Sequence, residues 1–131
     1  MNNSLILICG IPNSGKTTFS ELFKNVIHLD CTYFKLYEII ERNDNNLIIE
    51  GCFETKLSRK KLLSKIKSNK ICIYLKTDLW VCLDRELNYR KRGSKLVMHY
   101  YEKFEEPELE EGWDIIITIK NNKYLESIII K

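Results

Sequence analysis

The residues with the clearest chemistry lie between Gly10 and Thr18 and read GIPNSGKTT. A glycine, four further residues and then Gly15-Lys16-Thr17 is the spacing of a phosphate-binding loop. Backbone N–H groups of such a loop curl around phosphate oxygens, and glycine leaves room for that approach. Lys16 then reaches the β- and γ-phosphates, and the Thr17 hydroxyl holds Mg²⁺. The spacing predicts binding of a nucleoside triphosphate by Gly10, Asn13, Ser14, Gly15, Lys16, Thr17 and Thr18.

The sequence on either side of the loop supports this interpretation. An apolar run, residues 5–9, precedes the loop, and residues 16–25 have the pattern of a helix. A helix that starts at the loop points its partial positive charge at a bound anion. The alternative is a chance match in a glycine-containing turn, which the strand–loop–helix context disfavours.

Two carboxylates follow predicted strands. Asp30 comes after the strand at 26–29, and we interpret it as the general base that takes the proton of an acceptor hydroxyl. Its alternative role is to cap the next helix, and one residue can do both. Glu50 follows the strand at 47–49, where it either holds the hydration shell of Mg²⁺ or makes a structural hydrogen bond to the loop.

A cluster of cations lies near the break at Gly93-Ser94. Arg85, Arg90, Lys91 and Arg92 lie on the predicted helix after the fourth strand and in that break. Arginine offers a planar fork of donors to phosphate oxygens. We expect a mobile lid to bring Arg92 and Arg90 over the nucleotide, with Arg85 as the third choice. The alternative is that each is an ordinary surface arginine.

His28 and His99 lack a second histidine at ligand spacing and are interpreted as core or surface residues.

The elements that must position these residues alternate between strand and helix. Short connections between them indicate an α/β fold, a three-layer sandwich with a mainly parallel five-stranded sheet of the P-loop NTPase type. Ligands of such sheets bind beyond the carboxyl ends of the strands. We expect one domain, residues 1–131, and a sixth edge strand at 124–130. The expected strands are 5–9, 26–29, 47–49, 71–75 and 113–119, and the expected helices are 16–25, 32–41, 56–68, 79–91 and 95–105.

Composition narrows the class of protein only slightly. The net charge is +3, and five cysteines show no zinc-type spacing, so we expect them to be reduced. No apolar run approaches the ~20 residues of a membrane span, and no signal peptide is recognisable, so we expect a cytoplasmic protein.

Basic residues concentrate at 56–70 and acidic residues at 102–114. The basic helix is interpreted as a solvated face, with contact to a phosphate backbone as the alternative.

Taken together, the loop, Asp30 and the arginine segment resemble the polynucleotide 5′-hydroxyl kinases, both the bacteriophage type and the kinase domain of polynucleotide kinase-phosphatases. The more specific stretch is 98–114, MHYYEKFEEPELEEGWD, which is similar to a family segment of tyrosine, basic residue, Phe-Glu-x-Pro and Glu-Gly-aromatic. The chain departs from the phage enzymes three residues beyond the base, where Tyr33 and nearby Lys35 replace an arginine, and after the third strand, which is followed by Glu50-Gly51-Cys52-Phe53.

The resemblance implies ATP and Mg²⁺ as cofactors and the 5′-hydroxyl end of DNA or RNA as acceptor. It implies Asp30 as base, Lys16 and Thr17 at the triphosphate, and Arg92 as the lid arginine. Any phosphatase or ligase that heals ends with this kinase would be a separate chain, and no membrane partner is expected. Two alternatives stay open: a small-molecule kinase acting on a nucleoside, sugar or antibiotic hydroxyl, and an inactive nucleotide-binding module whose basic helix docks a partner.

Overall fold

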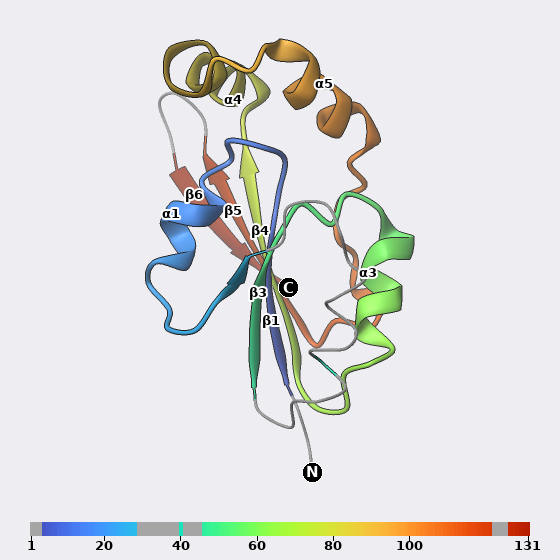
Figure 1. The fold of residues 1–131 in the computed structure, drawn as a ribbon. Helices are drawn as coiled ribbons and strands as arrows, with labels where there is room; N and C mark the ends of the chain where they lie inside the picture. Colours follow the sequence, from blue (N-terminus) through green and yellow to red (C-terminus); the bar gives the residue numbers. More distant parts are fainter. Residues whose placement is uncertain (1–3, 29–39, 41–45, 122–125) are drawn as a thin grey trace.

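The chain folds around a central sheet, shown in the computed structural model of Figure 1. The structure describes residues 4–28, 40, 46–121 and 126–131. Within these residues the sheet has six strands in the order β2-β3-β1-β4-β5-β6, of which only β6 is antiparallel to its neighbour. The strands are β1 (Leu5–Cys9), β2 (Ile27–His28), β3 (Leu47–Glu50), β4 (Lys70–Thr77), β5 (Ile115–Asn121) and β6 (Glu126–Ile130). The mainly parallel sheet and the expected edge strand are confirmed.

Helices lie on both faces of this sheet and at the carboxyl end of β4. In Figure 1, α1 covers one face, α3 covers the other, and α4 and α5 lie beyond the end of β4. The described helices are α1 (Lys16–Ser20), α3 (Lys56–Leu63), α4 (Leu79–Arg85), the π-helical turn η1 (Glu86–Arg90), α5 (Ser94–Lys103) and the 3₁₀ turn η2 (Leu109–Glu111). The arrangement is the expected three-layer α/β sandwich.

Several helix boundaries differ from the expected ones. The first helix stops at Ser20 instead of residue 25, and Asn25 adopts a left-handed conformation that a helix cannot contain. The expected helix 79–91 divides into α4 and the π turn, which ends at Arg90 and is followed by Lys91 with a φ of 58°. The expected helix 32–41 falls outside the described residues, apart from Ile40.

Alternation along the parallel strands builds a core on each face. Leu5, Leu7 and Cys9 of β1 belong to the cluster under α3 that includes Leu62 and Leu63. Ile8 points to the opposite face, where a second cluster joins Ile73 and Leu75 to Phe19 and Phe23. Because successive side chains of a strand point to opposite faces, a nearly continuous apolar run is what a strand covered on both sides requires.

The basic and acidic segments of the chain pair with each other. Arg59 of α3 is fully buried and forms an ion pair with Glu111, with 2.6 Å between Nε and Oε1. Lys56 of the same helix pairs with Glu108 at 3.0 Å. The interpretation of α3 as simply a solvated basic face is therefore incomplete, because its first turns are tied to residues 105–111.

Among the described residues, no helix combines the length and apolar character needed to cross a lipid bilayer.

Candidate functional site

The loop between β1 and α1 contains three residues with positive φ. Gly10 and Gly15 have φ values of 156° and 101°, and Asn13 is left-handed at 68°. A Cβ atom on Gly10 would lie 2.6 Å from Ser14 Oγ and 2.8 Å from the Leu75 carbonyl oxygen, so no larger residue fits. The Thr77 hydroxyl at the end of β4 donates to the Ser14 carbonyl oxygen at 2.7 Å and holds the loop against the sheet.

Lys16 is buried and folds back over its own loop. Its Nζ donates to the carbonyl oxygens of Gly10 and Ile11 at 2.9 and 2.8 Å. Ser14 Oγ is also buried, and it has no hydrogen-bond partner among the described residues. An orphaned hydroxyl beside an ammonium group inside a glycine loop fits a phosphate, because phosphate oxygens accept from both.

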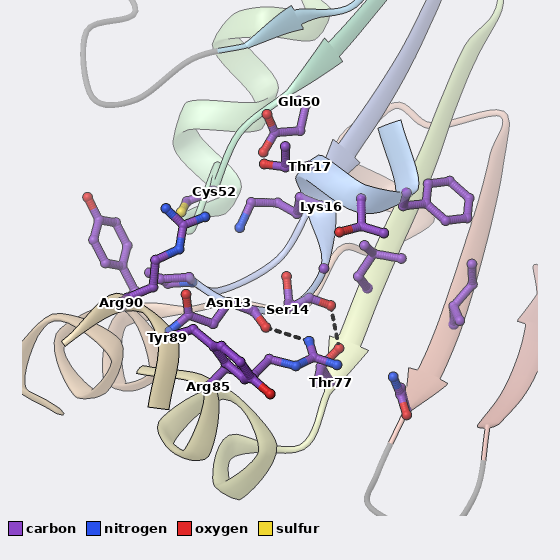
Figure 2. A pocket seen from close by; sticks show the side chains of 18 of the residues that line it. Asn13, Ser14, Lys16, Thr17, Glu50, Cys52, Thr77, Arg85, Tyr89 and Arg90 are labelled. Carbon is purple, nitrogen blue, oxygen red and sulfur yellow. Dashed lines mark hydrogen bonds between the residues drawn. The ribbon is translucent and has the colours of Figure 1, made fainter. Parts of the chain in front are cut away.

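A cavity of about 980 Å³ opens at this loop. It extends from the loop to the ends of β3, β4 and β5 and to η1 and α5, so it lies beyond the carboxyl ends of the strands as expected. Figure 2 shows the side chains that line it. Besides residues 12–19, the lining includes Glu50, Cys52, Thr77, Arg85, Tyr89, Arg90, Arg92, Tyr100 and Asn121.

Oxygen ligands for a metal lie on one side of the loop. Figure 2 shows the Glu50 carboxylate pointing toward the Thr17 hydroxyl. Glu50 is 7% exposed, and its Oε2 lies 2.7 Å from His28 Nδ1. Thr17 and Glu50 fit Mg²⁺, which prefers oxygen and keeps most of its water ligands. The described residues contain no group of three or more His, Cys, Asp or Glu side chains that could hold a metal ion.

His28 is a site residue that the sequence interpretation missed. It ends β2 and pairs in register with Glu50, which ends β3. Its imidazole is half exposed and orients the Glu50 carboxylate through the short contact at Nδ1. The signal was available in the sequence, because both residues are polar and both end neighbouring parallel strands.

Cys52 is a second missed residue. It follows β3, lines the cavity and lies close to Lys16 (Figure 2). Burial raises the pKa of the Cys52 thiol, and the nearby Lys16 ammonium opposes that rise. The thiol is therefore a neutral part of the cavity wall at physiological pH. Cys9, Cys52, Cys72 and Cys82, the cysteines of the described residues, are free thiols.

The three arginines have different roles. Arg85 donates from Nη1 to the Asn13 carbonyl oxygen at 2.7 Å and so holds the loop. Arg92 is tied to Glu86, with 2.8 Å between Nη2 and Oε1. Arg90 has no hydrogen-bond or ion-pair partner within the described part of the chain, and Figure 2 shows its guanidinium pointing toward Lys16 and Cys52.

Glu86 was not singled out from the sequence, yet it is 1% exposed and makes several contacts. Arg92 donates to it from its backbone N and from its guanidinium, and Asn13 Nδ2 donates to Oε1 at 3.2 Å. The hydrogen bonds from Arg92 hold the pKa of the Glu86 carboxyl at about 2. The group is thus ionised at neutral pH.

Asp30, Tyr33 and Lys35 lie outside the described residues, so their positions remain sequence predictions. The structure does bring together residues 13–18 of the loop, Glu50, Arg90 and Arg92 at one cavity, whereas Gly10 does not line it.

Comparisons with known proteins give a family and a fold. The model of the family described as "Chromatin associated protein KTI12" matches residues 3–93, well over half of the chain. No curated protein matches. A gluconokinase from Sinorhizobium meliloti 1021 has a similar structure, with a TM-score of 0.67 and 14% identity over 89% of this chain and 82% of that chain. The structure called APE1195 is also similar, with a TM-score of 0.54 and 18% identity over 82% of this chain and 81% of that chain. The fold is that of the P-loop kinases.

Proposed function

This chain belongs to the KTI12 family, and from that premise we propose that it is a phosphotransferase that moves the γ-phosphate of ATP to an alcohol. Our first choice of acceptor is the 5′-hydroxyl end of DNA or RNA.

One observation carries the proposal. Lys16, the Ser14 hydroxyl and the Arg90 guanidinium line a single cavity at a glycine loop, and the last two have no hydrogen-bond partner among the residues that the structure describes. Three donor groups of this kind are suited to an anion with many oxygens, and a triphosphate supplies it. Transfer of a phosphoryl group needs such positioning and charge stabilisation more than covalent chemistry by the protein.

The roles of the residues follow from their positions. The loop amides and Lys16 bind the phosphates, and Thr17 and Glu50 would hold Mg²⁺, whose charge offsets that of the β- and γ-phosphates. The acceptor oxygen forms a bond to the γ-phosphorus while the bond to the bridging oxygen breaks and ADP leaves. The acceptor proton passes to Asp30, which follows the strand that ends at His28.

Several features support a nucleic-acid end as acceptor. Tyr89 is 80% exposed where it lines the cavity, and Arg90 lies next to it. Exposed Lys91 continues the positive charge along the same segment. Aromatic rings and cations together suit a single-stranded end, because bases stack and phosphates need positive partners. The description of the family as chromatin associated agrees with this choice.

A small-molecule kinase is the second candidate. The similarity in fold to a protein named gluconokinase favours it, since that name denotes a small hydroxyl acceptor. The third alternative is an inactive module that only binds nucleotide. Any phosphoryl transfer by the chain would exclude it.

An acceptor experiment tests the proposal. Purified chain is incubated with Mg²⁺ and γ-labelled ATP, and with a 5′-hydroxyl oligonucleotide of DNA, the same oligonucleotide of RNA, or a panel of nucleosides and sugar acids. We expect label on an oligonucleotide and not on the small molecules. Asp30→Asn should lose transfer but still bind ATP. Label only on a small molecule would replace our first choice by the second, and normal transfer by Asp30→Asn would disprove the assignment of the base.

Arg90 gives a further prediction. Arg90→Ala is expected to lower the rate of transfer by about 100-fold, as for other single groups that stabilise transition-state charge. Arg92 is bound by Glu86, whereas Arg90 has no ion-pair partner in the described ranges, which supports Arg90 rather than Arg92 for this role.

The matched control for that measurement is Lys95→Ala. Lys95 is an exposed cation in the first turn of α5 and does not line the cavity. Its removal deletes the same charge and should change the single-turnover rate by less than about threefold, the scale of a screened surface charge. Equal losses in both variants would mean that Arg90 acts only through net charge.

A further inference from the structure

Asn13, the fourth residue of the phosphate loop, is held from outside the loop by the segment that carries the arginines. Its Nδ2 donates to the Cys82 carbonyl oxygen and to Glu86 Oε1, both at 3.2 Å. Its own carbonyl oxygen accepts from Arg85 at 2.7 Å, and its Oδ1 accepts from Arg92 Nη2 at 3.3 Å. All of these partners come from α4, η1 and the two residues that follow.

This support has a physical reason. Asn13 has a φ of 68°, in the left-handed region that residues with a Cβ atom occupy only at a cost. The conformation turns the backbone of the loop so that its N–H groups can face an anion. Asparagine adopts this conformation more readily than most residues, and the contacts from α4, η1 and Arg92 favour it over the other conformations open to Asn13.

Glu86 is the group that joins these contacts. Its buried carboxylate accepts from the Arg92 backbone N at 2.7 Å, from the Arg92 guanidinium and from Asn13 Nδ2. Only an ionised carboxylate has enough acceptor sites for this set. A glutamine would present an amide NH₂ to groups that are themselves donors.

We propose that Glu86 is a positioning residue, which fixes Asn13 in the conformation that binds the triphosphate. This inference rests on the proposed function. Glu86 touches neither the nucleotide nor the acceptor. Its effect reaches the ligand through Asn13.

Neutralising Glu86 is expected to change ATP affinity in opposite directions for a positioning role and for a purely electrostatic role. Glu86 is an anion close to a site for anions, so by Coulomb's law alone its neutralisation would strengthen ATP binding. Positioning requires the opposite, because the loop loses its preformed shape.

The experiment is a double-mutant cycle on the dissociation constant of MgATP, measured by calorimetry. Glu86→Gln is expected to weaken binding by about 10-fold, the effect of a hydrogen bond to a charged group. Asn13→Gly keeps a residue that tolerates positive φ but removes the side chain that Glu86 holds. In the Asn13→Gly background, Glu86→Gln should therefore change the affinity by less than about twofold.

Asp84→Asn is the matched control. Asp84 is an exposed carboxylate of α4, two residues before Glu86, and it contacts Asn88 rather than the loop. Its neutralisation should leave MgATP affinity unchanged or slightly stronger. Thermal unfolding of each variant shows whether it is folded. If Glu86→Gln does not fold, Glu86→Asp takes its place in the cycle, since it keeps the charge but withdraws the carboxylate by one methylene.

Three results would overturn the inference: unchanged affinity in Glu86→Gln, stronger affinity in Glu86→Gln, or an equal loss in the presence and absence of the Asn13 side chain. A wild-type chain that does not bind MgATP would instead refute the proposed function. The two failures are therefore distinguishable.

Discussion

Replacing Lys16 by alanine is expected to lower phosphoryl transfer by about 1,000-fold, within the range known for groups that stabilise charge on a transferring phosphoryl group. Lys16 is buried at the loop, and its ammonium group is already within 3 Å of two loop carbonyl oxygens. Only a rotation of the side chain is needed to bring Nζ to a triphosphate in the same cavity. Single-turnover transfer of labelled phosphate to the accepted hydroxyl measures the effect.

The control for this prediction is Lys24→Ala. Lys24 is exposed, follows α1 and lies outside the cavity, so its removal should leave the rate within about twofold of wild type. Circular dichroism of Lys16→Ala should match that of the native chain, because Thr77 still holds the loop to β4. A Lys16→Ala variant that transfers phosphate at the native rate would remove the loop from the mechanism altogether.

The loop could be predicted from sequence because its chemistry is local. Strand, glycines, lysine and helix all lie between residues 5 and 20. Backbone sterics demand glycine where φ reaches 156° at Gly10. Glu50 was also within reach, since polar residues at the carboxyl ends of parallel strands meet at one edge. The same rule points to His28, but the absence of a second histidine at ligand spacing led to its interpretation as a core or surface residue.

The assignment of the arginines could not be read from the sequence. In a regular helix, residues seven apart lie on nearly the same face, so Arg85 and Arg92 would point together. The π turn at Glu86–Arg90 and the left-handed Lys91 shift this register. Arg92 consequently meets Glu86, and Arg90 is directed into the cavity. A π turn of this kind has no clear sequence signature, and it occurs often at functional sites.

The contact between the basic and acidic segments could not be predicted from the sequence for a different reason. Residues 56–70 and 102–114 are visible as opposite charge blocks, but their contact depends on how α3 and η2 pack. Sequence patterns favour a solvated face for such a helix, because most lysine-rich helices are solvated. Burial of Arg59 in the basic helix depends on tertiary packing, and the local pattern of residues in the sequence does not predict it.

Arg59→Met is expected to lower the free energy of unfolding by about 3–5 kcal/mol, the cost of leaving one member of a buried ion pair without its partner. Arg59 donates to Glu111, to the Phe53 carbonyl oxygen and to the Glu105 carbonyl oxygen, each at 2.6 Å. Its removal leaves the Glu111 carboxylate buried with weaker partners, the Trp113 Nε1 at 3.4 Å and the Glu108 backbone N at 2.7 Å. Equilibrium urea unfolding measures the loss.

Two further variants identify the cause. Lys60→Met changes the adjacent exposed residue of α3 and should alter stability by no more than about 0.5 kcal/mol, as for other surface substitutions. Arg59→Met combined with Glu111→Leu removes both charges and should recover part of the lost stability, because the unpaired buried carboxylate is gone. If the double variant recovers no stability relative to Arg59→Met, the loss comes from the hydrogen bonds of Arg59 to the Phe53 and Glu105 carbonyl oxygens and not from the unpaired carboxylate. Those bonds hold the segment just after Cys52, so the cavity wall would then depend on them.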